Sequence, residues 1–374
     1  MDFTLGILGG GQLGRMLLQK AVDYNISTAV MDSDADAPCK NICNRFVNES
    51  FSDEEAVYQF GKTIDVLTVE IEHVNTNALK RLEAEGLPIY PQPAILEMVK
   101  DKGLQKQFYQ QQHLPTSKFV LLQNKAEFLQ LNYPLPVIQK IRSGGYDGKG
   151  VVKISSVPDF EKSFDAPMVL EDCIDIEKEV SVIVARNISG QTAAYPAVEM
   201  NFNAEANLVE FLFSPASISE QIAKAAEQIA LDLISRLKMV GVLAVEFFIT
   251  KQGAILINEI APRPHNSGHH TIEANVTSQY EQHLRAILNL PLGSTEMIRP
   301  AVMVNLLGEK GFEGPAIYDG LDEVLTMHET HIHLYGKKIT KPFRKMGHIS
   351  VTGSSIEEAR IKAEKVQKLI RIRS

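Results

Sequence analysis

The first 95 residues alternate short apolar runs with segments of helical spacing, and this alternation restricts the fold more than any other feature. Residues 3–8 form an apolar run that leads into a glycine cluster and then into apolar residues at helical spacing. Residues 27–32 and 65–70 are further runs typical of buried strands. Strands that alternate with helices predict a parallel, doubly wound sheet, so we expect an α/β, Rossmann-like domain over residues 1–98.

The rest of the chain is long enough for two more domains. Turn-forming residues at 90–93 precede the expected boundary near residue 98. We expect a second domain over residues 99–297, in which strands broken by Gly and Pro form a β-rich lid subdomain at about 119–183. Residues 298–374 contain strand-like runs and a final amphipathic segment. They predict a small C-terminal domain, so the class is α+β overall.

Composition and charge argue against several classes of protein. The formal net charge is -8, whereas a nucleic-acid-binding protein usually carries a basic face, so we expect no nucleic-acid partner. The sequence contains neither a secretory signal nor an apolar run of about 18 residues, which predicts no membrane association. Three sparse cysteines suit a reducing compartment, and the expected location is cytoplasmic.

The first glycine cluster has two readings. Gly9, Gly11 and Gly14 satisfy G-x-G-x-x-G, and Asp32 stands where a ribose-binding acid would stand. An NAD(P)-dependent oxidoreductase is therefore a rival hypothesis. A helix N-terminus behind glycines would accept any phosphate, however, so a substrate phosphate or a structural turn remains open.

A second glycine-rich stretch lies at residues 144–150, between the predicted strands 136–140 and 151–154. It lacks the spacing of a Walker loop. A β–β loop of glycines with one lysine can close over a triphosphate, donating backbone N–H groups and a positive charge. Lys140 would add a second positive charge at a strand end. An ordinary glycine-rich hairpin is the alternative.

Two acids on a predicted hairpin suggest a metal site. Strands 241–250 and 254–260 are joined by three residues, which is hairpin spacing. Pairing about this turn sets Glu246 opposite Asn258 and next to Glu259, to within one residue of register. Carboxylate and amide oxygens suit Mg²⁺, which completes its shell with water and substrate phosphates. Solvated charges at a sheet edge are the alternative.

The histidines of the stretch His-Asn-Ser-Gly-His-His raise the possibility of zinc, since His265, His269 and His270 lie close in sequence. Pro264 and Gly268 interrupt a helix there, which makes a regular metal-binding spacing unfavourable. We expect these residues to serve another purpose.

The order of these features resembles the ATP-grasp superfamily. The long segments GGGQLGRML, VEIEHV, GGYDGKG and NEIAPRPHNSGHHT resemble, within it, the N5-carboxyaminoimidazole ribonucleotide synthetase family. The resemblance extends over the whole chain. It implies an ATP-grasp fold with an N-terminal Rossmann-like (pre-ATP-grasp) domain and a small C-terminal domain.

The resemblance also implies a set of site residues. Implied ATP contacts are Lys102, Lys140, Gly145, Tyr146, Asp147, Gly148, Lys149, Gly150, Val151, Glu171, Asp172, Cys173, Ile174, Glu179, Phe202, Asn258 and Glu259. The implied metal ligands are Glu246 and Glu259, and the implied bicarbonate pocket consists of Arg263, His265 and Asn266. The implied ribonucleotide contacts are Gln12, Glu72, His73, Tyr146, Asp147, Lys337 and Arg344. The sequence departs from the family pattern at Lys102, where arginine is frequent, and at Phe202, where histidine is expected.

The implied activity is that of an ATP-dependent carbon–nitrogen ligase of purine biosynthesis. Bicarbonate and 5-aminoimidazole ribonucleotide would be the substrates, carboxyphosphate the intermediate and Mg²⁺ the metal, in a homodimer. A formate-dependent glycinamide ribonucleotide transformylase would use the same ATP site with another acyl donor. A nucleotide sensor without turnover is a further alternative.

Overall fold

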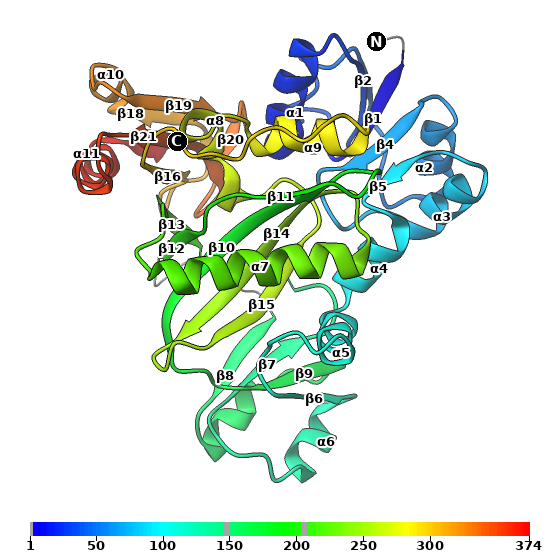
Figure 1. Ribbon diagram of the computed structural model, residues 1–374, viewed down its shortest axis with the longest axis vertical. Coiled ribbons are helices and arrows are strands. Elements are labelled where there is room, and N and C mark those ends of the chain that lie inside the picture. Colours follow the sequence, from blue (N-terminus) through cyan, green and yellow to red (C-terminus); the bar gives the residue numbers. More distant parts are fainter. Residues whose placement is uncertain (1–2, 146–149, 204–207) are drawn as a thin grey trace.

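The computed structural model describes residues 3–145, 150–203 and 208–374. Figure 1 shows an N-terminal sheet at one end, a large sheet in the middle and a smaller sheet at the opposite end. In Figure 1 the N-terminal sheet and the elements of the C-terminal part, residues 298–374, lie at the same end of the molecule.

The N-terminal sheet is parallel throughout, which confirms the predicted doubly wound topology. Its strands, in spatial order, are β3 (Arg45–Val47), β2 (Ser27–Met31), β1 (Thr4–Leu8), β4 (Val66–Val69) and β5 (Ile89–Tyr90). Its helices are α1 (Gln12–Asp23), α2 (Glu54–Gly61) and α3 (Thr76–Ala84). Separate apolar clusters pack around α1 and around α2 and α3, because buried parallel strands present apolar side chains to both faces.

Side-chain caps fix where several helices begin. Asp53 accepts a hydrogen bond from the third residue of α2, and Asn75 does the same for α3. Asp101 accepts from two N–H groups of α5 (Lys102–Gln111), directly after α4 (Pro93–Lys100). These oxygens satisfy backbone donors that have no partner inside the helix.

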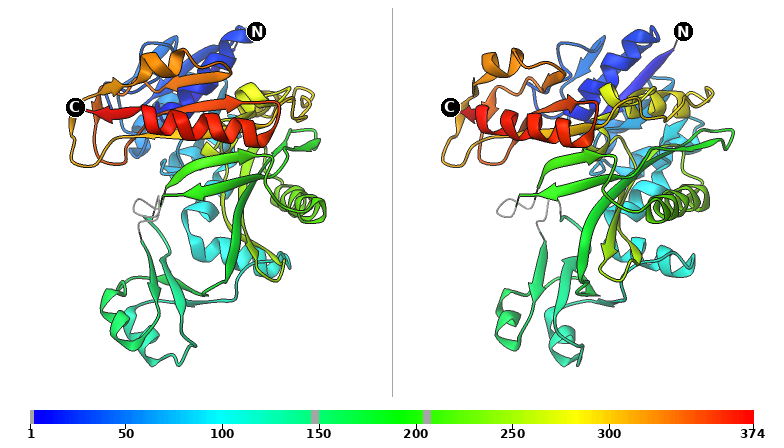
Figure 2. Two further views of the ribbon diagram at one scale, coloured as in Figure 1. Left: turned by 90° about the vertical axis from the view of Figure 1, so that its left-hand side faces the viewer. Right: turned by 60° about the vertical axis from the view of Figure 1, so that its left-hand side comes forward.

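The small sheet has the strand order β6 (Phe119–Leu122), β9 (Met168–Asp172), β7 (Val137–Ile141) and β8 (Val151–Ile154). It is covered by α6 (Lys125–Gln130) and the short helix η1 (Val157–Lys162), where Phe128 and Phe160 meet edge to face. Figure 2 shows this sheet extending away from the rest of the molecule. These strands correspond to those predicted on either side of residues 144–150.

The large sheet continues from the predicted second domain into the C-terminal one. Its path in the described residues is β15 (Ile255–Ala261), β14 (Gly241–Thr250), β10 (Ile176–Arg186), β12 (Val198–Phe202), β13 (Val209–Ser214), β16 (Ala301–Leu307), β21 (Lys345–Thr352) and β19 (Thr330–Leu334), with β11 (Thr192–Ala194) beside β10. Pairing of β13 with β16 joins the two parts. The C-terminal part therefore shares one continuous sheet with the hairpin of β14 and β15.

Helices cover the large sheet in two places. The predicted amphipathic helix, α7 (Glu220–Leu237), packs on β10, β14 and β15, and α11 (Ile356–Leu369) packs on β16 and β21. Helix α9 (Gln279–Ile287) packs against α1 and so connects the large sheet to the N-terminal one. The remaining short elements are η2 (Asn266–Gly268), α8 (Thr271–Ala274), α10 (Leu321–Leu325), β17 (Gly314–Pro315), β18 (Ile317–Asp319), β20 (Ile339–Thr340) and β22 (Arg371–Arg373).

Candidate active site

The hairpin of β14 and β15 carries the two predicted metal ligands. Glu246 pairs directly with Glu259, one residue away from the expected register, because a bulge follows this pair. The bulge places two residues of β15 where a regular strand has one. Asn258 accepts a hydrogen bond from Lys140 at 2.9 Å, while Glu259 accepts one from Lys102 at 2.7 Å. Two consecutive side chains of β15 thus contact the same group of lysines.

The two hairpin carboxyl groups are strongly coupled. Burial raises the pKa of Glu246, and the charges of Glu259 and Glu179 raise it further. Burial also acts on Glu259, but the Lys102 ammonium outweighs it and lowers the pKa of that carboxyl. A divalent cation would allow both groups to ionise, so this pair fits Mg²⁺. In the described ranges no group of three or more His, Cys, Asp or Glu side chains could hold a metal ion, and substrate oxygens would have to complete the shell.

A small cavity beside the hairpin brings together five of the predicted nucleotide residues. Its lining consists of Lys102, Gln105, Lys106, Tyr109, Lys140, Glu171, Asn258 and Glu259. Glu171, on β9, forms ion pairs at 3.2 Å with both Lys140 and Lys106. Burial raises its pKa, but Lys140 and Lys106 outweigh that effect, and the pKa lies below its usual value. Positive charges from α5 and β7 therefore converge on one point.

The segment that follows Glu171 connects the small sheet to β10. Asp172 accepts a hydrogen bond from the Tyr133 hydroxyl at 2.6 Å, and Cys173 and Ile174 are half-buried. Glu179, on β10, has a raised pKa, chiefly because of burial. Phe202, at the end of β12, packs against an apolar cluster that includes Met200. Its ring therefore contributes to core packing.

Residues 144–150 connect β7 to β8. Tyr146, Asp147, Gly148 and Lys149 lie outside the described residues. Gly150 has a φ of +82°, and a Cβ atom there would lie 2.5 Å from the Ile141 side chain, so both conformation and space require glycine. Gly145 precedes the undescribed stretch and Val151 begins β8.

The predicted bicarbonate residues lie beyond the end of β15. Arg263 Nε is 2.9 Å from Glu72 Oε1, an ion pair that joins this segment to the N-terminal domain. His265 Nδ1 accepts from the Ser267 N–H at 3.3 Å, and Nε2 is 3.7 Å from Glu246 Oε1. Burial lowers the His265 pKa to about 3, so the imidazole is neutral. Both side-chain polar atoms of Asn266 are buried without a hydrogen-bond partner, as expected of groups built to meet a ligand.

The first glycine loop is filled by the protein's own acids. Asp32 Oδ2 accepts a hydrogen bond from Gly10 N at 2.6 Å, and Glu70 Oε1 accepts one from Leu13 N at 3.2 Å. A Cβ atom on Gly11 would lie 2.4 Å from Glu70 Oε1. Two N–H groups that a pyrophosphate could use, those of Gly10 and Leu13, are therefore occupied by protein carboxyl groups. The glycine motif thus has a structural explanation that needs no dinucleotide. Gln12 is the first residue of α1, and His73 is exposed near Glu72.

The C-terminal part contributes lysines to the same region. Lys337 donates to the Lys345 carbonyl at 2.8 Å, and Arg344 donates to the Ile339 carbonyl at 2.7 Å. Lys345 was not predicted from the sequence. Its charge favours the proton-free forms of both Glu246 and His265, so it opposes the rise in the pKa of Glu246 and adds to the fall in the pKa of His265. Its basic neighbourhood (Lys341, Arg344) was the only hint in the sequence.

Three further histidines, His269, His333 and His348, form a stack. His348 lies between His269 and His333, with ring centroids 4.5 and 4.4 Å apart. Each ring of the stack also forms a side-chain hydrogen bond: His269 with Tyr280, His348 with Tyr335, and His333 with Glu273. The stack joins the segment after β15 to β19 and β21.

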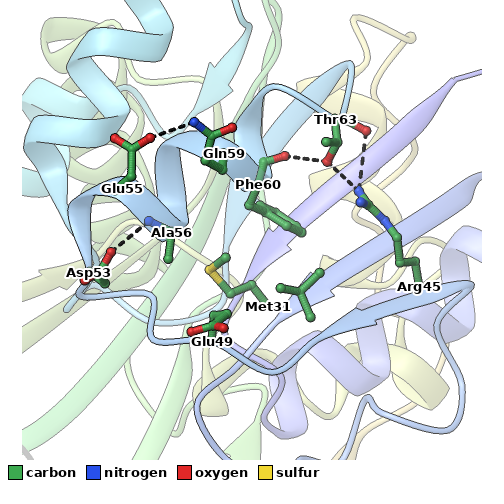
Figure 3. A pocket seen from close by; sticks show the side chains of 10 residues that line it. Met31, Arg45, Glu49, Asp53, Glu55, Ala56, Gln59, Phe60 and Thr63 are labelled. Atoms are coloured by element: carbon green, nitrogen blue, oxygen red, sulfur yellow. Dashed lines mark hydrogen bonds between the residues drawn. The ribbon is translucent and has the colours of Figure 1, made fainter.

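A larger hollow lies elsewhere, beside β3 and α2. It has a volume of about 470 Å³, and Figure 3 shows Met31 and Phe60 between the acids Asp53 and Glu55 on one side and Arg45 on the other. None of the site residues predicted from the sequence lines it, so size alone does not locate the active site.

Comparison with known proteins accounts for this arrangement. Family models match in three segments: a ribonucleotide synthetase preATP-grasp domain at residues 2–100, an ATP-grasp domain at 107–280 and a phosphoribosylaminoimidazole carboxylase C-terminal domain at 301–362. The N5-carboxyaminoimidazole ribonucleotide synthase of Brucella melitensis is 39% identical over 93% of this chain and 95% of its own length. The chain belongs to the N5-carboxyaminoimidazole ribonucleotide synthase family.

Solved structures agree with this membership. A Thermotoga maritima N5-carboxyaminoimidazole ribonucleotide synthetase matches with a TM-score of 0.92 and 42% identity, over 100% of this chain and 99% of that one. An Aspergillus clavatus N5-carboxyaminoimidazole synthase, solved with ADP and 5-aminoimidazole ribonucleotide, matches with a TM-score of 0.89 and 33% identity over 98% of both chains. The ATP-grasp fold with a preATP-grasp domain is thereby confirmed.

Several yeast relatives are longer. The chain spans about two thirds of the phosphoribosylaminoimidazole carboxylases of Ogataea methanolica (67%) and Candida albicans (65%), each 38% identical to it. The described residues contain no helix long and apolar enough to cross a membrane.

Proposed function

We propose that the chain catalyses ATP-dependent carboxylation of 5-aminoimidazole ribonucleotide by bicarbonate, in purine biosynthesis. The proposal rests on the position of Glu246 between two groups of residues. Glu246 pairs across the hairpin with Glu259, which contacts Lys102 of the nucleotide cavity. Its Oε1 atom also lies 3.7 Å from His265 Nε2, in the segment that contains Arg263 and Asn266. A site for phosphoryl transfer therefore adjoins a site for a small anion.

The first step is attack of a bicarbonate oxygen on the γ-phosphorus of ATP, which forms carboxyphosphate and releases ADP. Such a transfer depends on neutralising charge and aligning the reactants. Lys102 and Lys140 would supply positive charge, while Asn258 holds the Lys140 ammonium in place. A Mg²⁺ ion held by Glu246 and Glu259 would neutralise the phosphate oxygens.

Arg263 and Asn266 would orient the bicarbonate. The Arg263 guanidinium offers several donors, and its ion pair with Glu72 fixes its direction. His265 is held by Ser267 and Gln279, and as a neutral ring with Nδ1 accepting, it presents an N–H at Nε2. That donor suits an anion or the oxyanion that forms on it.

In the second step the exocyclic amine attacks the carboxyl carbon, the C–O bond to phosphate breaks and the amine loses a proton, leaving a carbamate. Gln12, Glu72 and His73 would bind the ribonucleotide, with Lys337 and Arg344 toward its phosphate. Tyr146 and Asp147 would close over it, because water must be excluded while carboxyphosphate exists. No covalent bond to the protein is required.

Three features of the whole protein belong to the same proposal. We propose the division into units at about residues 98 and 297, a homodimer, and a cytoplasmic location. Size-exclusion chromatography with light scattering tests the dimer.

The activity is tested by ADP release. Bicarbonate and 5-aminoimidazole ribonucleotide should accelerate ADP formation together and not singly. Acceleration by glycinamide ribonucleotide with formate instead would assign the chain a different acyl donor. ATP binding without turnover under either condition would leave a nucleotide sensor.

A further inference from the structure

Lys106 is a buried lysine that lines the nucleotide cavity beside Lys140. It lies on α5, only 2% exposed, and points toward the small sheet. Its ammonium donates to Thr116 Oγ1 at 2.7 Å and to Ser117 Oγ at 2.8 Å, and it lies 3.2 Å from Glu171 Oε2. Burying a charge is costly unless it is paired and hydrogen-bonded, and here every donor of Lys106 has a partner.

Glu171 divides its two oxygens between two lysines. Oε2 accepts from Ser117 at 2.7 Å and faces Lys106, whereas Oε1 faces Lys140 at 3.2 Å without a hydrogen bond. A hydrogen bond from Ser117 thus fixes the oxygen on the side of Lys106, whereas the oxygen on the side of Lys140 is held by an ion pair of the same length alone. The Lys140 ammonium makes its short contact, 2.9 Å, with Asn258 instead.

We propose that Lys106 is a positioning residue, which engages Glu171 so that Lys140 keeps its positive charge available for the nucleotide phosphates. The inference rests on the proposed function only in taking Lys140 as a phosphate contact. Two lysines and one glutamate leave one net positive charge in this cluster. Without Lys106 the cluster would have no net charge, and Glu171 would pair with Lys140 alone.

The surroundings of Lys106 make its charge sensitive to pH. Burial lowers its pKa to about 8, Glu171 of β9 raises it, and Lys140 of β7 and Lys102 of α5 lower it. Glu259 of β15 and Tyr109 of α5 line the same cavity. Lys106 is therefore charged at pH 7 and loses its proton as the pH rises above about 8.

The decisive variant is Lys106→Met, which keeps most of the apolar stem and removes the charge. Calorimetric titration with MgADP should show binding at least about tenfold weaker than in the wild type, the effect of losing one charge-assisted contact. In turnover, the KM for MgATP should rise by a similar factor, while kcat and the KM for 5-aminoimidazole ribonucleotide change by less than about threefold. A purely structural lysine would not produce this division.

Two comparisons separate charge from packing. Ser117→Ala removes a neutral contact of the same carboxylate, so MgADP binding should weaken by less than about threefold. Lys362→Met removes a lysine of α11 that is likewise held in ion pairs, with Glu329 and Glu358, but lies outside the nucleotide cavity. It should leave MgADP binding unchanged. Equal losses in Lys106→Met and Ser117→Ala would overturn the charge argument.

The wild-type protein provides a test that does not depend on the variant folding. At a Mg²⁺ concentration that saturates the metal site at every pH, so that ionisation of Glu246 does not contribute, its KM for MgATP should rise between pH 7.5 and 9, whereas that of Lys106→Met should be high and constant. A wild-type KM that is flat over this range, or MgADP binding unchanged in Lys106→Met, would refute the role of Lys106. Failure of wild-type protein to bind MgADP at all would instead refute the proposed nucleotide site.

Discussion

Glu70→Gln tests how the first glycine loop is stabilised. The Glu70 side chain lies against Gly9 and Gly11 and accepts a hydrogen bond from Leu13 N. Burial raises the pKa of its carboxyl from the ordinary 4.5 to about 7. Its charged form is therefore disfavoured in the folded protein. Gln keeps the shape and an acceptor oxygen but cannot ionise.

The expected effect follows from linkage. A carboxyl whose pKa is raised by folding contributes stability that is complete below pH 4.5 and is lost as the pH rises toward about 7. At about 1.36 kcal/mol per pKa unit the upper limit is about 3.4 kcal/mol. Partial exposure of the side chain reduces this to about 2 kcal/mol. The free energy of unfolding of Glu70→Gln, relative to that of wild type, should thus increase by about 2 kcal/mol between pH 4.5 and 8.

The assay is thermal unfolding of both proteins at several pH values, which should separate their Tm values by at least about 3 °C more at pH 8 than at pH 5. Glu83→Gln, at an exposed position of α3, is the matched control and should follow wild type. Parallel curves for wild type and Glu70→Gln across this range would show that Glu70 is not held in the protonated form, and the reasoning would fail.

Two further predictions concern the reaction. Glu259→Gln should abolish the charge of one metal ligand and reduce ADP formation at least about 100-fold, with a matching loss of Mg²⁺ affinity in calorimetry. Because the pKa of Glu246 is raised, wild-type Mg²⁺ affinity should also fall as the pH is lowered, since metal and proton compete for that carboxylate; an affinity independent of pH would contradict this. Arg263→Lys keeps the charge but loses the fixed donor pattern, so the KM for bicarbonate should rise at least about tenfold with the KM for MgATP unchanged. Equal increases in both constants would place Arg263 elsewhere in the mechanism.

The elements could be predicted from the sequence because each carries a local pattern. The strand at β1, the long helix α7 and the hairpin β14–β15 were all expected within a few residues. The pairing of β13 with β16 could not be predicted in this way. It joins strands separated by more than 80 residues, and neither strand encodes its partner.

The site was predictable to the extent that its residues lie in continuous motifs. Glu246 and Glu259 were identified from hairpin spacing, yet the bulge that sets their register depends on packing beyond the hairpin. Lys345 and Lys106 were missed because an isolated lysine in a strand or helix resembles a surface residue until its burial is known. Conversely, the glycine motif at Gly9 suggested a dinucleotide, and only the structure revealed that Asp32 and Glu70 accept hydrogen bonds from two of its N–H groups.

The most direct test of the account is a single assay of ADP release by the wild-type protein, with MgATP, bicarbonate and 5-aminoimidazole ribonucleotide supplied together and then each omitted in turn. We predict rapid ADP formation only in the complete mixture, with carbon from labelled bicarbonate recovered in an acid-labile carbamate. ADP formation that is unaffected by the amine, or no labelled carbamate, would contradict the central claim.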